Sequence, residues 1–173
     1  MDSLIFNSTI SKEEVFGKVR KFLETHGFKV VSEDQDRPWG GFFVIDETQI
    51  RKFHDDFFAD IPFSESQYSQ KLSPKFLLVA PGARLSWQYH FRRAEIWKLI
   101  FGEAGIVRSQ TDEMGKEQEM ILGKTIQLQK GERHRLTGKQ NWGVIAEIWM
   151  HTDPSEPSDE LDIVRVQDDY DRK

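Results

Sequence analysis

From Pro74 onward the chain breaks into short runs rich in Val, Ile, Leu, Phe and Trp, separated by turn signals that contain glycine. Such spacing is typical of the strands of a β-sandwich or barrel. Together with one run before Pro74, they predict strands at 41–46, 75–79, 85–90, 96–101, 105–109, 118–122, 125–128, 134–137 and 143–151. A chain of 173 residues is the size of one ordinary domain, so these strands should share one barrel.

Two amphipathic segments come before most of these strands. Ser11 and Glu14 fit a capping box that starts a helix, and Gly27 suits its end. A second helical pattern runs over 47–58, followed by a loop over 62–73. We therefore expect an N-terminal helical extension over 1–36, then a barrel over 37–173 whose acidic C-terminal extension folds back on it.

Charge and residue types narrow the function. The chain has 24 Lys and Arg against 29 Asp and Glu, a net charge of −5, whereas nucleic-acid binders usually present a dominant basic surface. It has no Cys, so any metal must be held by nitrogen and oxygen ligands. With neither a signal-like start nor an apolar run long enough to span a bilayer, we expect a cytoplasmic protein that binds no nucleic acid and no membrane.

Four polar side chains stand out among the predicted strands. Gln88 and His90 share one face of the strand at 85–90, because side chains alternate along a strand. Glu95 begins the next run after a short turn, and His134 follows a later turn that a closed barrel could return to the same centre. These residues are our candidate metal ligands.

The same residues carry a resemblance. Gly82, Gln88, His90, Glu95 and Gly102 resemble the first cupin motif, with Gln88 where the commonest form has His. Residues 129–134 look like the second motif, with Gln129 in place of its usual Pro. The resemblance implies a cupin (jelly-roll) barrel that binds one divalent metal ion through Gln88, His90, Glu95 and His134.

A longer ordered set of motifs resembles the type II phosphomannose isomerase cupin domain. It comprises Arg37-Pro-Trp-Gly40, Pro81-Gly-x-x-Leu-Ser-x-Gln88-x-His90-x-x-Arg93-x-Glu95-x-Trp97, Gly131-x-x-His134-Arg135-Leu136, Ile145-x-Glu147, Asp162-Ile-Val-Arg165 and Asp169-Tyr170-x-Arg172. Members of that family often carry a nucleotidyltransferase domain, for which this chain is too short. The resemblance also implies a homodimer.

The activity implied is the interconversion of mannose 6-phosphate and fructose 6-phosphate. The N/O ligand set suits Zn²⁺ first, with Fe²⁺, Mn²⁺, Co²⁺ or Ni²⁺ as alternatives, acting as a Lewis acid. Glu147 and Arg165 are the candidate catalytic residues, although Glu147 could equally be the buried partner of an arginine. Arg93, Arg165 and Arg172 are the candidate ligands of the sugar phosphate, although Arg165 could simply tie the acidic tail to the barrel.

Several departures from the family pattern leave other functions open. Phe91, Arg92 and Ile96 stand where further His residues are usual, Trp149 stands in place of Gln, and Asp171 in place of Gly. A related isomerase that acts on a different sugar, such as an unphosphorylated pentose or another phosphosugar, is one alternative. A sugar-binding cupin without catalysis is another, and a cupin oxygenase is the most distant.

Overall fold

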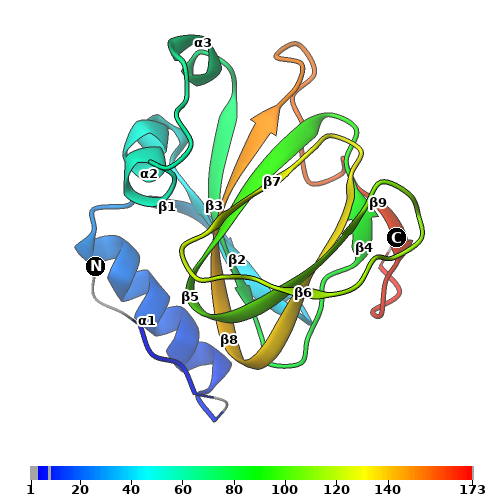
Figure 1. Cartoon of the computed structure of the whole chain (residues 1–173). Helices are drawn as coiled ribbons and strands as arrows, with labels where there is room; N and C mark the ends of the chain where they lie inside the picture. Colours follow the sequence, from blue (N-terminus) through cyan, green and yellow to red (C-terminus); the bar gives the residue numbers. More distant parts are fainter. Residues whose placement is uncertain (1–3, 8, 173) are drawn as a thin grey trace.

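The computed structural model describes residues 4–7 and 9–172. Within them the protein is mainly β, with nine strands in one antiparallel sheet that curls round an inner core (Figure 1). The strands are β1 (Val30–Asp34), β2 (Gly40–Ile45), β3 (Leu72–Val79), β4 (Trp87–Tyr89), β5 (Arg93–Ser109), β6 (Gln118–Glu119), β7 (Thr125–Leu128), β8 (Arg133–His151) and β9 (Val164–Gln167). The helical elements are α1 (Lys12–Thr25), the 3₁₀ turn η1 (Glu47–Gln49), α2 (Ile50–Phe57) and α3 (Glu65–Tyr68).

Two long strands organise the sheet. β5 and β8 pair with each other along most of their length, from Arg93 opposite His151 to Ser109 opposite Arg133. The C-terminal half of β8 also pairs with β3, and its first residues pair with β4, which in turn pairs with β9. The sheet can therefore bend around β8, so that strands distant in sequence enclose one interior.

The alternating faces of the strands separate two hydrophobic layers. In β3, Phe76 and Leu78 pack in the layer beneath the helices, whereas Leu77 and Val79 pack in the barrel interior. The outer layer is strongly aromatic: the ring centroid of Phe16 in α1 lies 5.4 Å from that of Phe43. Figure 1 shows α1 and α2 on the side of the barrel away from β4 and β9, so the helices cover its back and leave those strands uncovered.

The helix predictions are confirmed. The Ser11 hydroxyl accepts a hydrogen bond from the Glu14 amide, and the Glu14 carboxylate accepts one from the Ser11 amide, as a capping box requires. Gly27 follows α1 with φ of 73°, a left-handed conformation that suits glycine. The segment predicted at 47–58 forms η1 and α2. None of the helices in the described part of the chain is long and apolar enough to cross a membrane.

The structure differs from the sequence analysis in several elements. The segment 1–36 contains β1 as well as α1; β1 was missed because it is a mostly exposed edge strand with little apolar alternation. The short helix α3 lies in the predicted loop. The separate strands predicted at 96–101 and 105–109 form one strand, in which Gly102 marks a shift of register, with φ of 72°, instead of a chain reversal. The strands predicted at 134–137 and 143–151 likewise join as β8.

Candidate metal centre

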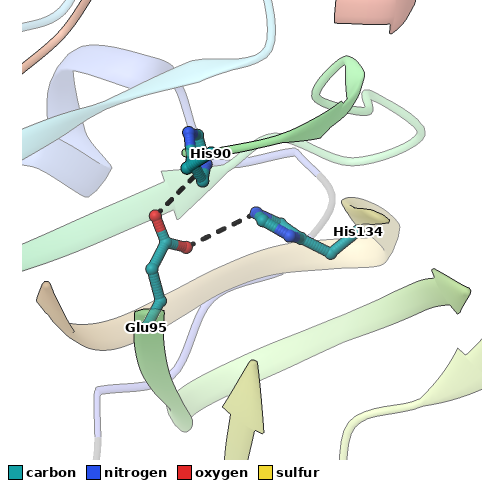
Figure 2. Close-up of side chains that lie close together, drawn as sticks. All are labelled: His90, Glu95 and His134. Atoms are coloured by element: carbon teal, nitrogen blue, oxygen red, sulfur yellow. Dashed lines mark ion pairs between the residues drawn. The ribbon is translucent and has the colours of Figure 1, made fainter. Parts of the chain in front are cut away.

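Three strands bring the candidate ligands together. His90 follows β4, Glu95 lies in β5 and His134 lies in β8, all with exposed fractions of 2%. The Glu95 oxygen Oε1 lies 3.3 Å from His90 Nε2, and its Oε2 lies 3.5 Å from His134 Nε2. Figure 2 shows the carboxylate directed at both imidazoles. One potential ligand atom from each residue falls within 4.8 Å of the others, a separation that a single ion can bridge.

The second nitrogen of each imidazole is already engaged. His90 Nδ1 lies 2.6 Å from the carbonyl oxygen of Asp162, and His134 Nδ1 lies 2.9 Å from that of Glu132. Each Nδ1 therefore carries the ring proton and donates a hydrogen bond to that carbonyl oxygen. The lone pair of each Nε2 is left facing Glu95. No hydrogen-bond donor to His134 Nε2 is found among the described residues, although this atom is buried. A buried lone pair without a hydrogen-bond donor can coordinate a metal ion, so these residues fit a metal site.

The protonation states also suit a cation. Burial lowers the pKa of His90 to about 3 and lowers that of His134, so both imidazoles are neutral near pH 7. Burial opposes ionisation of Glu95, but nearby positive charge outweighs it and holds its pKa below the usual range; with both imidazoles neutral, that charge is the Arg93 guanidinium, which also donates a hydrogen bond to the carboxylate. Two neutral nitrogen donors and one carboxylate leave net positive charge on a divalent ion.

Gln88 lies beside this cluster but turns its oxygen away. Its Cα is paired with that of His134 across β4 and β8, and its side-chain nitrogen lies 3.4 Å from His90 Nε2. The side-chain oxygen accepts a hydrogen bond from the Ser86 hydroxyl at 2.5 Å. Rotating the amide by half a turn would exchange the two atoms, as ligation requires. Ligation by Gln88 therefore stays a prediction.

Arg93 is tied into the centre itself. Its Nε donates to Glu95 Oε1 at 2.7 Å, and one terminal nitrogen lies 3.1 Å from His90 Nε2. The other terminal nitrogen donates to the Ser158 hydroxyl at 2.8 Å. Every guanidinium nitrogen of Arg93 thus has a protein partner. Its assignment to a sugar phosphate stays a prediction, and the contacts seen here connect Glu95 to the loop before β9.

A cavity of about 70 Å³ opens beside Glu95 and Gln88, and the remaining candidate catalytic and phosphate-binding residues line it. Glu147, in β8, is buried there and accepts a hydrogen bond from the Trp97 indole at 2.9 Å. The same indole nitrogen lies 3.1 Å from Glu95 Oε2, so Trp97 links the two carboxyl groups. Burial raises the pKa of Glu147, and the negative charge of Glu95 acts in the same direction. A carboxyl with raised proton affinity is suited to proton transfer.

The cavity is rich in positive charge. Among the described residues, five cationic side chains and three carboxyl groups line it: Arg37, Lys75, Arg93, Arg165 and Arg172 against Glu95, Glu147 and Glu160. Two of the arginines also have acidic partners outside the lining, since Arg37 Nε lies 2.8 Å from Asp34 and Arg172 lies 2.5 Å from Asp168. Arg165 enters from β9, where its Cα is paired with that of Gln88. The lining as a whole favours an anionic ligand.

Three residues of the site were not predicted from the sequence. Lys75 was passed over, although it shares strand parity with Leu77 and Val79 and must therefore face the interior. Trp97 shares parity with Glu95, which signalled its role in the same way. Asp162 was read only as the start of a motif, and nothing local in the sequence shows that its carbonyl group orients His90.

Asp162 also fixes the turn between two of the candidate ligands. Its carboxylate accepts hydrogen bonds from the amides of Phe91 and Arg92 at 2.9 and 3.0 Å, and from the Ser158 hydroxyl at 2.6 Å. Because this turn sets the spacing between His90 and Glu95, Asp162 positions the ligands through both its side chain and its backbone. It is a positioning residue for the centre.

We expect the protein to bind close to one divalent ion per chain, and His90→Ala or His134→Ala to remove most of that metal while the fold persists. Each substitution deletes one of the few nitrogen ligands of the centre. Elemental analysis after metal loading and dialysis measures the metal content, with circular dichroism to verify the fold. His26→Ala, at the end of α1 and remote from the cluster, is the matched control. Equal metal content in all four proteins would show that the ion, if any, binds elsewhere.

We expect Asp162→Asn to weaken Co²⁺ binding by about 10- to 100-fold, the usual effect of disturbing groups that orient metal ligands. The amide would direct a donor at a backbone N–H or a hydroxyl that now donates to the carboxylate. Calorimetry gives the affinity, and the visible absorption of bound Co²⁺ reports ligand geometry. Asp153→Asn, an exposed change in the same loop, is the control. An unchanged affinity and spectrum in Asp162→Asn would rule out the positioning role.

Comparisons with solved structures agree with the barrel. Oxalate decarboxylase of Bacillus subtilis superposes with a TM-score of 0.55 and 13% identity, over 78% of this chain and 30% of that one. Vicilin of tomato (Solanum lycopersicum) gives a TM-score of 0.51 and 13% identity, over 73% and 32% of the two chains. At this identity the likeness concerns the fold alone, which is that of the cupins.

Two curated sequences and one family model also match the chain. Xanthan biosynthesis protein XanB of Xanthomonas campestris pv. campestris is 28% identical over 138 residues, which cover 79% of this chain and 23% of that protein. A mannose-1-phosphate guanylyltransferase of Salmonella montevideo is 25% identical over 172 residues, 99% of this chain and 30% of that protein. The chain therefore spans less than a third of the length of these relatives. The model of the family described as "Mannose-6-phosphate isomerase C-terminal" matches residues 62–168, more than half of the chain, and the protein belongs to that family.

Proposed function

We propose that this cupin domain is a metal-dependent sugar-phosphate isomerase that interconverts mannose 6-phosphate and fructose 6-phosphate. The observation that carries the proposal is one shared cavity: Glu95 of the candidate metal centre, the buried Glu147 and a set of arginines all line it. Isomerisation of a sugar phosphate by this route uses three elements together. These are an electrophile, for which the metal centre stands, a proton carrier, for which Glu147 stands, and an anchor for the phosphate, for which the arginines stand. The family membership and the names of the relatives support the choice of mannose phosphates.

The anchor is an electrostatic requirement. A phosphosugar brings roughly two negative charges, and a cavity that contained the ionised Glu95 without cations would repel it. We assign the phosphate to Arg165 and Arg172, since a guanidinium group can donate two parallel hydrogen bonds to phosphate oxygens. Arg37 lines the same cavity and is a third cation within the site.

The proton transfer is assigned to Glu147. In the reaction a proton leaves C2 of the aldose and returns at C1 of the ketose, so one carboxyl group can accept it and give it back. Trp97 fixes the Glu147 carboxyl by its hydrogen bond and keeps it close to Glu95. A divalent ion, with Zn²⁺ as our first choice, would supply Lewis-acid stabilisation of the negative charge that develops on the sugar oxygens. His90, Glu95 and His134 would hold it, with Gln88 as a fourth ligand.

A different sugar is the second candidate, and Trp149 is the observation in its favour. Its ring lines the cavity and packs against two cations, with Lys75 Nζ 3.6 Å and Arg93 Cζ 3.5 Å from the ring centroid. The family pattern places a smaller, polar Gln at this position. A large indole in the wall of this cavity leaves less room for a hexose than Gln would and favours a smaller or differently oriented sugar.

We also retain the homodimer as a proposal. Strand β1 ends the sheet, and Val31 on it is 52% exposed, so an open strand edge in the segment before Pro38 is available for an interface.

The proposed reaction predicts exchange with solvent. We expect the Zn²⁺-loaded protein in D₂O to convert mannose 6-phosphate to fructose 6-phosphate and to place deuterium at C1 of the ketose and C2 of the aldose. NMR follows both the conversion and the exchange. Glu147→Gln, which keeps the shape of the side chain but cannot carry the proton, should lose this activity while it still binds metal. Conversion of another aldose phosphate or of a plain pentose in place of mannose 6-phosphate would favour the second candidate. Absence of exchange with every sugar tried would exclude an isomerase.

We expect Arg165→Ala to weaken binding of mannose 6-phosphate by about 1.5 to 3 kcal/mol, the range for a hydrogen bond to a charged group. Binding of plain mannose should change much less, because that sugar has no phosphate. Calorimetric titration of both sugars separates the two effects, with Arg51→Ala on the exposed surface of α2 as the control. Equal losses for the two sugars would mean that Arg165 supports the fold and makes no contact with phosphate.

A further inference from the structure

Lys75 places a buried ammonium group in the wall of the cavity. Its side chain is only 6% exposed, and β3 directs it to the same interior face as Leu77. Its Nζ lies 3.6 Å from the ring centroid of Trp149 and 4.9 Å from that of Phe42. Aromatic faces stabilise a cation but do not neutralise its charge, so a buried ammonium still needs an anion nearby.

Glu160 supplies that anion from the loop between β8 and β9. Its carboxylate forms an ion pair with Lys75, yet the Glu160 side chain remains 58% exposed. The loop is anchored on both sides of Glu160: the Ser158 amide donates to His151 Nδ1 at 2.8 Å, and the Asp162 carboxylate binds the turn after β4. Glu160 can therefore leave Lys75 by rotation of its side chain while the loop stays in place.

The two partners gain unequally from this pair. If the Glu160 side chain rotated away from Lys75 into solvent, its carboxylate would be hydrated again at little cost, because exposed ion pairs contribute little to stability. Lys75 would remain desolvated without its carboxylate partner, which is costly for a buried charge. Separation of the pair would therefore cost mainly because Lys75 is desolvated. Another anion that reaches the cavity can replace Glu160 as the partner of Lys75.

We propose that Lys75 is an anion-binding residue of the cavity, and that the Glu160 carboxylate occupies in the unliganded protein the place that a phosphate group of the ligand takes. Phosphate fits better than a carboxylate because Arg37, Arg165 and Arg172 line the same cavity and can bind its further oxygens. Glu160 is then an internal competitor of the ligand. That the phosphate belongs to a sugar rests on the proposed function, whereas the exchange at Lys75 does not.

The test is the affinity of the full chain for inorganic phosphate, measured by calorimetry. We expect Glu160→Gln to bind phosphate about fivefold more tightly than the unaltered protein, the factor for an ion pair worth about 1 kcal/mol. Adding Lys75→Met, which keeps a long apolar side chain over Trp149, should abolish the gain. Glu156→Gln removes one negative charge from the same loop, and no ion pair of Glu156 is found among the described residues. This control should bind phosphate like the unaltered protein.

Equal phosphate affinity in Glu160→Gln and the unaltered protein would overturn the proposal, and so would a gain that persists with Lys75→Met. An equal gain in Glu156→Gln would reduce the effect to overall charge and would also overturn it. The isomerase assay is independent of these outcomes. A phosphate gain specific to Glu160 without any sugar isomerisation would sustain the anion site and refute the proposed function, whereas isomerisation without the gain would do the reverse.

Discussion

The long antiparallel pairing of β5 with β8 is the constraint on which the rest of this structure depends. The two strands run side by side from Arg93 opposite His151 to Ser109 opposite Arg133, so each contributes to both ends of the barrel. Glu95 enters the interior from β5, while β8 contributes His134 near its start and Glu147 near its end. Because Trp97 is paired with Glu147 in this register, its indole can reach both Glu95 and Glu147. A shift by one residue would turn these side chains to the opposite face.

The acidic C-terminal extension is as much a part of the site as the barrel strands. The loop before β9 orients His90 through the Asp162 carbonyl, and its Ser158 hydroxyl accepts a hydrogen bond from Arg93. It also places Glu160 against Lys75. Isolated buried charges are expensive, and each of these contacts offsets the desolvation of a charged or polar group in the interior. The extension therefore completes the polar interior that the strands begin.

The polar interior has a consequence for function. A barrel stabilised by apolar packing alone would not place carboxyl, imidazole and guanidinium groups around one small cavity. Here the neutral imidazoles, the ionised Glu95 and the raised proton affinity of Glu147 all follow from burial and from the charges nearby. Groups of similar chemistry thus acquire different protonation states within one cavity, as acid–base chemistry requires.

The sequence by itself determined the local features: the capping box at Ser11, the alternation that places Gln88 and His90 on one face, and most of the strands. These depend on neighbouring residues and on the fixed periods of helix and strand. Only the tertiary structure decided that the Asp162 carbonyl meets His90 and that Glu160 meets Lys75, since these partners are 72 and 85 residues apart in the chain. It also decided that β1 joins the sheet. Such contacts arise from how the sheet curls and where a loop is anchored, and no local pattern of residues encodes that geometry.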